Sequence, residues 1–341
     1  MKFLFIPISL LFYFITSIRN FLFDYNILKA EKFDIPIICV GNLSLGGSGK
    51  TPHVNYIIKE LSKMFNVAVI SRGYKRNNKN LLFVDYNSNV LEVGDEPLML
   101  KKKNPDTIIL VSGDRAKGIK KIINEYPKID VIILDDGFQH RWVRSGFNLL
   151  LTSASNPFYK DYLFPFGSLR ESKKGYKRAD AIIVTNNTEK LEKSYIKKIQ
   201  SEFSISDKPI IFSKVKYQKP KYLFGDKVLE NLKERSIILL TAIANPTPLI
   251  NYINKNSTLN YHMKFKDHHN YTINDIKNIL SYYNRVKDVK KLILTTEKDS
   301  VKLLQFNKEL TGLEIYFIPI EIEVNDKENF DKKLIEYVST N

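Results

Sequence analysis

The sequence predicts an α/β protein of two parts: a three-layer α/β/α domain built on a parallel sheet, and a second, smaller α/β/α domain. Short apolar runs of strand length alternate with segments whose apolar residues recur at helical spacing, the pattern of a parallel sheet covered by helices. A glycine-rich loop follows the first of these runs. A stretch rich in Lys, Pro and Tyr, residues 208–226, separates a longer series of strands from a shorter one.

The apolar runs of the first series are short enough to be buried strands rather than helices. In chain order they are Ile35–Val40, Val67–Ile70, Thr107–Val111, Val131–Leu134, Phe147–Leu151 and Ala181–Val184. The segment between the first two is expected to be a helix, because its apolar residues share one face: Val54, Ile57, Ile58, Leu61 and Phe65.

The second series predicts three strands and two helices. The strands are expected at Ser236–Thr241, Leu292–Thr295 and Ile315–Ile320, and the helices near Asn274–Tyr283 and after Asp326. We therefore divide the chain into an apolar N-terminal segment, residues 1–30, a larger domain, residues 31–215, and a smaller α/β domain, residues 216–341.

The N-terminal segment Phe3–Ile18 carries no charge and lies between Lys2 and Arg19. It is shorter than the roughly 20 residues that span a bilayer as a helix. No small-residue cleavage site follows it, which argues against a signal peptide. A buried core helix and an amphipathic helix in the membrane interface are left. Aromatic rings beside basic residues favour the interface helix, which Pro7 would bend or begin.

The composition points to an anionic partner without naming one. The 341-residue chain has a formal net charge of +16, which suits acidic lipid, a phosphorylated substrate or nucleic acid, although a Lys-rich surface can also serve solubility alone. No nucleic-acid recognition motif appears, so nucleic acid is not expected. The single cysteine, Cys39, excludes an intramolecular disulfide, and the spacing of His262, His268 and His269 fits no common zinc pattern.

The glycine-rich loop predicts a nucleotide site. It ends in Gly49-Lys50-Thr51, as a Walker A loop does, and a strand precedes it. Glycines let backbone N–H groups wrap phosphates, and the helix that follows adds positive potential. Lys50 is expected to reach the β and γ phosphates, and the Thr51 hydroxyl to coordinate Mg²⁺. The expected nucleotide-binding residues are Ser44, Leu45, Gly46, Gly47, Ser48, Gly49, Lys50 and Thr51.

Two adjacent carboxylates, Asp135 and Asp136, follow the apolar strand Val131–Leu134. A strand that ends in Asp is the Walker B arrangement, which places a carboxylate beside the Mg²⁺ at the phosphate loop. An acidic turn before Gly137 is the ordinary alternative. The sequence does not decide which of the two carboxylates would contact the metal directly.

Further motifs narrow the type of phosphate-loop protein. They are Ser71–Tyr74, Gly94–Pro97, Asp114–Arg115, Leu169–Glu171, Ala244–Pro246, Asp267–His269 and Thr296–Asp299. Together with the apolar N-terminus, the Ser44–Pro52 loop and Asp135–His140, they resemble the tetraacyldisaccharide 4′-kinases, the P-loop kinases of lipid A biosynthesis. Ser44 replaces the first Walker glycine in that family too. The chain departs from the family pattern at Ala242, where glycine is usual, and within Thr152–Asn156.

The resemblance implies a fold and a reaction. The fold is two α/β/α domains joined by a short two-stranded linker. In such a fold the segment after about Leu313 can belong either to the second domain or again to the first. The reaction is transfer of the γ-phosphate of ATP, with Mg²⁺, to the 4′-hydroxyl of a tetraacyldisaccharide 1-phosphate, a lipid A disaccharide. The implied location is the cytoplasmic face of the bacterial inner membrane, where the chain is peripheral or monotopic and meets an anionic surface.

The resemblance also implies roles for single residues. Asp95 is the candidate base for the sugar hydroxyl, paired with His268 or His269, and Glu171 joins Thr51, Asp135 and Asp136 around the metal. Arg115, like Arg72 and Arg170, is a candidate to hold phosphates. Each has a more ordinary interpretation: a helix-starting turn for Gly94–Pro97, a surface ion pair for Glu171 and the arginines, and helix capping for Thr272–Asp275 and Thr296–Asp299.

A P-loop ATPase or GTPase of the partition or metal-delivery type is the alternative function, because such proteins also carry a glycine-rich loop before Lys-Thr. Partition ATPases usually have a second Lys near the loop start, where this chain has Leu45. A guanine-specific protein would show an Asn-Lys-x-Asp motif after the strands of the second series, and none occurs there.

Overall fold

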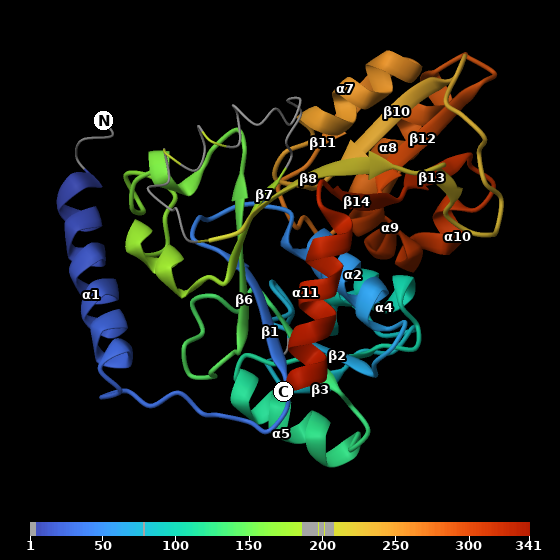
Figure 1. Cartoon of the computed structure of the whole chain (residues 1–341). Coiled ribbons are helices and arrows are strands. Elements are labelled where there is room, and N and C mark those ends of the chain that lie inside the picture. The colour runs from blue at the N-terminus through green and yellow to red at the C-terminus, as the bar shows by residue number, and fades with distance from the viewer. Residues whose placement is uncertain (1–4, 78, 186–196, 198–200, 202–207) are drawn as a thin grey trace.

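The computed structural model describes residues 5–77, 79–185, 197, 201 and 208–341. Figure 1 shows two α/β units and a long helix, α1 (Ile6–Asp24), that lies along the flank of the larger one. Residues 1–4 of the apolar N-terminal segment, Phe3 included, lie outside the described residues.

The described residues of the larger unit form a nine-stranded sheet in the order β14-β8-β7-β6-β1-β5-β2-β4-β3. All neighbouring strands run parallel except the two edge strands, β3 and β14. The six strands predicted for this unit all form, with ends shifted by at most two residues. The strands are β1 (Ile37–Asn42), β2 (Val67–Ser71), β3 (Leu82–Phe83), β4 (Ile108–Val111), β5 (Val131–Asp135), β6 (Phe147–Ser153), β7 (Ala181–Thr185), β8 (Ile210–Tyr217) and β14 (Ile320–Val324).

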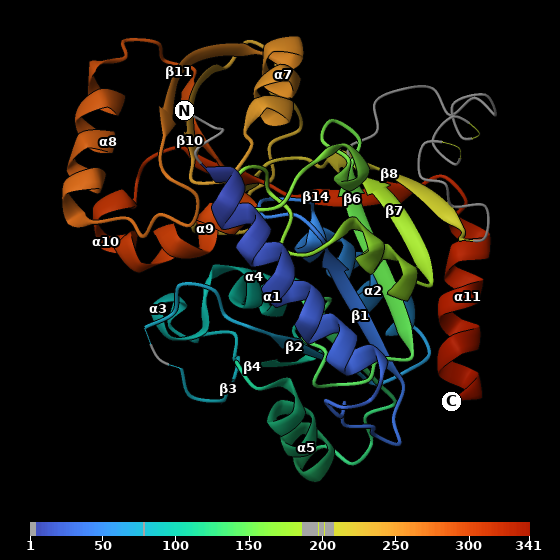
Figure 2. The same cartoon turned by 90° about the vertical axis from the view of Figure 1, so that its left-hand side faces the viewer.

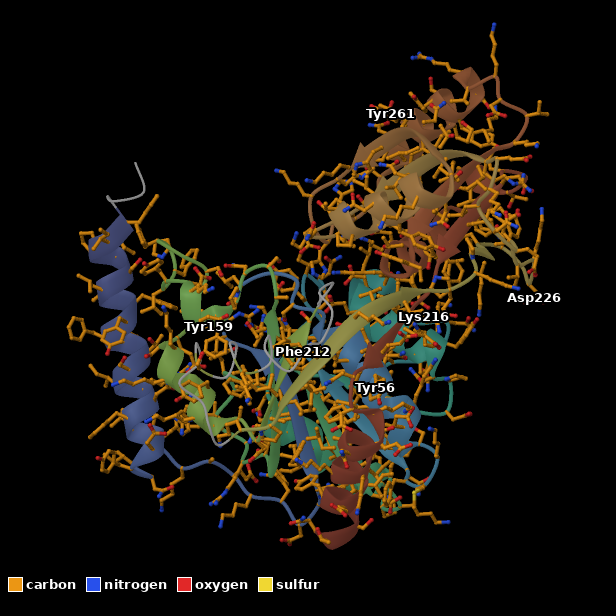
Figure 3. The ribbon with its side chains drawn as sticks, turned by 45° about the horizontal axis from the view of Figure 1, so that its top comes forward. Tyr56, Tyr159, Phe212, Lys216, Asp226 and Tyr261 are labelled. Atoms are coloured by element: carbon orange, nitrogen blue, oxygen red, sulfur yellow. The ribbon has the colours of Figure 1, made fainter. Side chains whose placement is uncertain are left out.

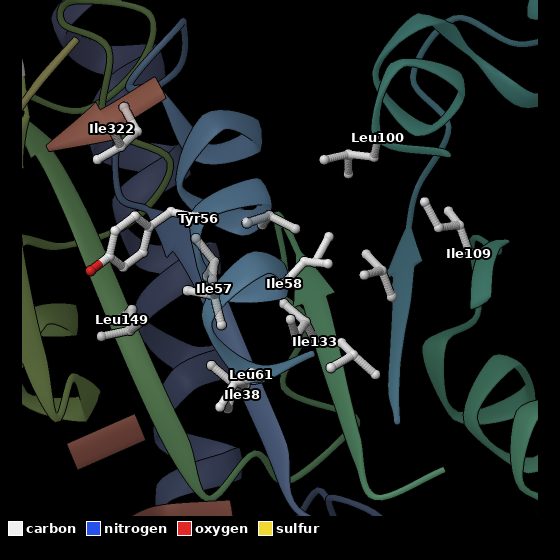
Figure 4. Packing of buried hydrophobic residues seen from close by; sticks show 14 of the residues in the cluster. Ile38, Tyr56, Ile57, Ile58, Leu61, Leu100, Ile109, Ile133, Leu149 and Ile322 are labelled. Atoms are coloured by element: carbon white, nitrogen blue, oxygen red, sulfur yellow. The ribbon is translucent and has the colours of Figure 1, made fainter. Parts of the chain in front are cut away.

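Helices cover both faces of this sheet because its strands are apolar on both sides. In β1, Ile38 and Val40 pack with one cluster and Ile37 and Cys39 with two others, as the two-residue period of a strand requires. The first cluster includes Ile57 and Leu61 of α2 (Figure 4). The helices are α2 (Lys50–Leu61), α3 (Val90–Val93), α4 (Asp95–Lys103), α5 (Arg115–Glu125) and α11 (Lys327–Thr340), with the short 3-10 turns η2 (Phe158–Lys160) and η3 (Lys173–Arg178).

The smaller unit is a five-stranded sheet, counted over the described residues, in the order β11-β10-β12-β13-β9. Only its edge strand β9 is antiparallel. Leu249 and Ile253 of α7 pack on one face of it, and Ile276 and Ile279 of α8 on the other. The elements are β9 (Lys221–Tyr222), β10 (Ser236–Thr241), α7 (Thr247–Asn256), β11 (Thr258–Lys264), α8 (Ile273–Arg285), β12 (Lys291–Thr296), α9 (Glu297–Leu303), η4 (Leu304–Phe306), α10 (Asn307–Leu310) and β13 (Ile315–Ile318).

Two antiparallel strands connect the units. β8 ends the parallel part of the larger sheet, and β14 pairs with it from Ile320 opposite Tyr217 to Val324 opposite Ser213. The predicted single strand Ile315–Ile320 is therefore wrong: it is two strands in different sheets. Pro319 separates them, because it has no N–H to give to either ladder. The domain boundary that the sequence places between residues 215 and 216 falls inside β8.

Helix α1 contacts the rest of the chain along a narrow stripe. Only Ser9, Thr16 and Phe23 are buried, and Pro7 stands in the first turn and begins the helix. The Ser9 hydroxyl donates to the Leu163 carbonyl at 3.2 Å. Figure 2 shows α1 in front of the larger unit, and most of its side chains project outward (Figure 3). The interpretation of this segment as a buried core helix is therefore wrong. Among the described residues, α1 is the one helix whose length and mean hydropathy, 1.5, would also allow it to cross a membrane.

Candidate active site

The phosphate loop runs from the end of β1 to the first turn of α2. Leu45 N donates to Ser168 O at 2.7 Å, which fixes the loop to the segment before Glu171. Gly49 precedes the helix with φ +81°, a left-handed conformation that glycine adopts without strain. Lys50 and Thr51 then begin α2, so the loop and the helix N-terminus together present backbone N–H groups at the carboxyl end of the sheet.

Buried hydrogen-bond donors without a protein acceptor gather around this loop. Among the described residues, four such donor atoms are Asn42 Nδ2, Ser48 Oγ, Arg115 Nε and Arg170 Nε. A buried donor left without an acceptor costs free energy, unless a ligand supplies the acceptor. Four donors of this kind around a glycine-rich loop are the arrangement that an anionic ligand would satisfy.

Lys50 and Arg170 both face Asp136. The Lys50 ammonium lies 3.6 Å from Asp136 Oδ1 and 3.3 Å from Asn42 Oδ1, and Arg170 Nη1 donates to Asp136 Oδ1 at 3.0 Å. Burial alone would raise the pKa of Asp136, but the charges of Lys50 and Arg170 outweigh it and lower that pKa. Asp136 is therefore an ionised carboxylate, held in a left-handed backbone conformation at φ +54°.

Asp135 differs from its neighbour. It ends β5 opposite Val40 of β1, is almost fully buried, and accepts from the Ser71 hydroxyl at 3.3 Å through Oδ2 only. Its Oδ1 is buried without a hydrogen-bond partner among the described residues. Burial, with the charges of Glu96 and Asp136, raises the pKa of Asp135 to about 7. A buried carboxylate oxygen of this kind is suited to a divalent cation, and Asp135, Asp136 and the buried Thr51 are the residues that could hold one.

Glu171 lies in a separate network. It is fully buried, and its carboxylate accepts from Arg178 at 2.8 Å, from Gln139 at 3.1 Å and from Asn20 of α1 at 2.6 Å. Its interpretation as a surface ion pair is therefore wrong. Both carboxylate oxygens already have protein donors, and the predicted role of Glu171 at a metal stays a prediction. No three His, Cys, Asp or Glu side chains form a cluster that could hold a metal ion in the part of the chain that the structure describes.

Arg115 is buried at the start of α5, beside the two carboxylates. Its Nη1 donates to the carbonyls of Ser112 and Gly113, and its Nη2 lies 3.5 Å from the Asp136 carbonyl. These contacts place the guanidinium near the phosphate loop but fix it mainly to backbone. Arg72, at the end of β2, is exposed.

Asp95 meets His268 where the two units join. Gly94, at φ +93°, caps α4, so that Asp95 is its first residue and is buried. Nδ1 of His268 lies 3.0 Å from both carboxylate oxygens of Asp95. The backbone of His268 has φ +56°, and its backbone N–H donates to the Ala242 carbonyl at 3.1 Å. A left-handed conformation at a non-glycine residue is uncommon and is often found at functional sites.

Two lysines of α9 that the sequence reasoning missed complete this cluster. Lys298 Nζ lies 2.9 Å from His268 Nε2 and 3.0 Å from Glu96 Oε1. Lys302 is fully buried, 2.6 Å from Asp299 Oδ1 and 3.7 Å from Asp95 Oδ2. Burial would raise the pKa of Asp95, but the hydrogen bond from His268 and the charge of Lys298 outweigh it and lower that pKa. The signal in the sequence was the i, i+4 spacing of the lysines, which puts them on one helix face.

His269 is not part of the cluster. Its Nε2 lies 2.9 Å from Asp275 Oδ2, and its ring stacks on Phe265 with centroids 4.8 Å apart. Thr272 and Asp275 form the predicted capping box at the start of α8, which is confirmed. Of the two histidine candidates for pairing with Asp95, the structure thus places His268 there and His269 at the end of a helix.

Comparison with known proteins decides the family. The model of the family described as tetraacyldisaccharide-1-P 4′-kinase matches residues 1–339. The chain belongs to this family. The predicted resemblance and the kinase class are confirmed, and the ATPase or GTPase of the partition or metal-delivery type is set aside.

Relatives and a solved structure agree with the 4′-kinase family over nearly the whole chain. A tetraacyldisaccharide 4′-kinase of Flavobacterium johnsoniae is 38% identical over 339 residues, which cover 98% of this chain and 96% of the relative. One from Bacteroides fragilis is 37% identical over 350 residues, covering 98% and 93%. The crystal structure of LpxK from Aquifex aeolicus in complex with ATP has a TM-score of 0.79 at 30% identity and covers 99% of both chains. The predicted fold class is confirmed.

Proposed function

We propose that the chain transfers the γ-phosphate of ATP to the 4′-hydroxyl of a tetraacyldisaccharide 1-phosphate in lipid A biosynthesis. The observation that carries this proposal is that the phosphate loop and the Asp95–His268 pair lie at the same junction between the units. Gly47 of the loop lies close to the smaller unit, because a Cβ placed on it would be 3.4 Å from Ala244 Cβ. Two residues before Ala244, the Ala242 carbonyl accepts a hydrogen bond from the backbone N–H of His268. A phosphate donor and an acceptor hydroxyl can therefore meet there.

The loop from Ser44 to Thr51 is the proposed ATP site. Its backbone N–H groups and the buried donors of Asn42, Ser48 and Arg170 supply hydrogen bonds to phosphate oxygens. Lys50 supplies a positive charge for the transferring phosphoryl group, which carries charge on three oxygens as its bond to the leaving oxygen breaks. The ATP bound in the solved Aquifex aeolicus relative supports the same ligand here.

Thr51, Asp135 and Asp136 are the proposed holders of Mg²⁺, which supplies positive charge to the β and γ phosphates. The residues fit this ion, because an unpartnered carboxylate oxygen of Asp135 and an ionised Asp136 stand beside the loop. Mg²⁺ in such sites is usually held by one or two carboxylates, with phosphate and water as the other ligands.

Asp95 is the proposed acceptor of the proton from the sugar hydroxyl. As the hydroxyl oxygen forms its bond to phosphorus, the O–H bond breaks and the proton passes to the carboxylate. The lowered pKa of Asp95 keeps it ionised and ready to accept at neutral pH. His268 donates to this carboxylate and fixes its orientation.

The proposed location is the cytoplasmic face of the bacterial inner membrane, with α1 in the membrane interface. Leu11, Phe14 and Ile18, at positions i, i+3 and i+7, leave 59–61% of their surface exposed on one side of the helix. An acylated disaccharide is itself held in a bilayer, so a kinase that acts on it must work at the lipid surface. The net charge of +16 suits an anionic surface.

A transfer assay tests this function. The full-length protein is mixed with Mg²⁺, ATP labelled at the γ-phosphate and a tetraacyldisaccharide 1-phosphate in detergent. We expect label in a lipid product that is separated by thin-layer chromatography. Label released only as inorganic phosphate, with none in the lipid, would contradict the proposal.

A further inference from the structure

Lys298 reaches the far side of the His268 ring from Asp95. Its Nζ lies 2.9 Å from Nε2, closer than either acidic group on that side: Glu96 Oε1 lies 3.9 Å and Asp267 Oδ2 4.0 Å from the same nitrogen. A lysine ammonium has three hydrogens to donate and no lone pair. Nε2 must therefore accept in this contact, and it cannot carry a proton of its own.

The position of the ring proton follows. A neutral imidazole has one N–H, and if Nε2 accepts then Nδ1 carries the hydrogen. Nδ1 is the atom that lies 3.0 Å from both carboxylate oxygens of Asp95. A doubly protonated ring would place a second positive donor against the Lys298 ammonium at 2.9 Å, which the contact does not permit.

We propose that Lys298 is a positioning residue of the kinase reaction, which holds His268 as the neutral tautomer with its proton on Nδ1, facing Asp95. The inference rests on the proposed function, because Asp95 is there the proton acceptor. In this arrangement His268 does not take up the proton of the sugar hydroxyl, since its Nε2 is occupied. It donates to Asp95 and leaves that carboxylate as the final acceptor within the cluster.

The groups that surround His268 support this assignment. Asp95 and Glu96 approach the His268 ring from α4, and Lys298 approaches it from α9. Asp267 directly precedes His268 in the chain, and the Tyr74 ring packs edge-to-face on the His268 ring with centroids 4.9 Å apart. Of the charged groups, only Asp95 and Lys298 are within hydrogen-bond distance of a ring nitrogen. Glu96 and Asp267 instead pair with the Lys298 ammonium, at 3.0 and 3.6 Å, and hold it charged at Nε2.

The chain offers a matched control. Lys103 of α4 pairs with Glu297 of α9 at 2.7 Å, so it joins the same two helices as Lys298, and the side chains of Lys103 and Lys298 are 14% and 15% exposed. Among the described residues, Lys103 donates to Glu297 and to the Ile320 carbonyl, and not to His268. Both Lys103→Met and Lys298→Met therefore remove an ion pair between α4 and α9. Only Lys298→Met also removes the contact with Nε2 of His268.

Nitrogen-15 NMR of the histidine rings in the full-length protein is the test. His268→Gln identifies the His268 signals, whose two ring nitrogens have different shifts when protonated and unprotonated. We expect a protonated Nδ1 and an unprotonated Nε2 in the wild type and in Lys103→Met. In Lys298→Met we expect Nε2 to become protonated as well, because no ammonium then donates to it, while Asp95 still holds the proton on Nδ1. We expect kcat to fall by about tenfold or more and KM for ATP to change by less than about twofold. Lys298→Arg, which keeps the charge and donors, should restore the neutral ring with an unprotonated Nε2.

Other results would overturn the inference. Wild-type His268 protonated on Nε2 or on both nitrogens, or an unprotonated Nε2 with an unchanged kcat in Lys298→Met, would each do so. The NMR experiment needs no substrate, so it can refute the role of Lys298 independently of the proposed function. If the spectra are as expected but the protein does not phosphorylate the lipid, Lys298 still fixes the protonation of the ring. The lack of phosphorylation would then overturn the proposed reaction.

Discussion

Nδ1 of His268 lies 3.0 Å from both carboxylate oxygens of Asp95, although 173 residues separate them in the chain. Asp95 belongs to the larger unit and His268 to the smaller one, so the proposed proton acceptor and its orienting donor come from opposite sides of the junction. The contact of Gly47 with Ala244 brings the phosphate loop to the same junction. The reaction therefore depends on how the two units are held together.

Asp95→Asn should lower kcat by about 100-fold or more, because the amide cannot accept the hydroxyl proton. KM for ATP should change little, since Asp95 is not part of the loop that holds the phosphates. Steady-state kinetics with both substrates measures both constants. Glu92→Gln, an exposed carboxylate three residues earlier, is the control and should behave as wild type. A near-normal kcat in Asp95→Asn would remove Asp95 as the base.

Asp135→Asn should stabilise the protein at pH 8 in the absence of divalent cations. The folded protein holds a proton on Asp135 up to about pH 7, whereas the unfolded chain releases it near pH 4. The folded state therefore binds more protons in this window, and the free energy of unfolding of the wild type falls as pH rises through it. The variant lacks this loss, and should be more stable at pH 8 by about 4 kcal/mol and nearly equal at pH 4.

Thermal unfolding between pH 4 and 8 measures this difference, with the exposed Asp106→Asn as control. Addition of Mg²⁺ and ATP should then raise the Tm of the wild type more than that of Asp135→Asn, because the cation replaces the proton on the carboxylate. A difference between the two proteins that does not vary with pH would show that Asp135 is not held protonated by burial.

Glu171→Gln should destabilise the protein whether or not Mg²⁺ is present. The change leaves Arg178 without its carboxylate and places an amide group among the donors of Asn20 and Gln139. Removal of one partner from a buried pair costs about 3 kcal/mol. Denaturant unfolding measures the loss, and Glu230→Gln, from the exposed pair with Lys219, should cost little. A loss that appears only with Mg²⁺ would instead place Glu171 at the metal.

Leu11→Ser, Phe14→Ser and Ile18→Ser combined should release the protein from membranes. Each removed side chain takes away apolar area worth about 1 kcal/mol or more in the lipid interface. The Tm should stay close to that of the wild type, because these side chains are exposed in the fold. Sedimentation with vesicles that contain anionic lipid measures binding. Met64→Ser with Val289→Ser, exposed apolar residues outside α1, is the control. Unchanged sedimentation of the α1 variant would contradict a membrane role for α1.

Local signals made the phosphate loop and its helix predictable. The apolar run, the glycines, Lys50 and Pro52 lie within a few residues of one another, and each has a local physical reason. The order of the strands was not predicted, because β1 pairs with β5 and β6, which are distant in the chain, and not with β2. Asp135 in register with Val40 is a consequence of that pairing.

Elements with one exposed side were harder to predict. The residues of β8 were assigned to a domain junction without a strand of their own, because β8 leaves the core halfway: Lys214 and Lys216 are exposed and both pair with Glu323 of β14. Figure 3 shows Lys216 on this strand, where β8 extends toward the smaller unit. β11, an edge strand, lacks an apolar run for the same reason, and the sequence reasoning missed it together with α7.

Contacts across the junction were the least predictable part of the site. Lys298 belongs to the Thr296–Asp299 motif, which helix capping alone could explain, and its i, i+4 spacing from Lys302 shows only that the two lysines share a helix face. Its place at His268 depends on the packing of α4 against α9, and no spacing within one segment reports that packing. His269, next in the chain, was as good a candidate as His268 until their rings were seen to face different partners.

The position of the new phosphate on the lipid is the decisive test of the proposed reaction. Wild-type protein is incubated with Mg²⁺, ATP and a tetraacyldisaccharide 1-phosphate, and the lipid product is examined by phosphorus–proton correlation NMR, with Lys50→Ala in parallel. We expect a second phosphorus signal correlated with the proton on C4′, and no such signal with Lys50→Ala. A phosphate at another position, or ATP hydrolysis without a phosphorylated lipid, would contradict it.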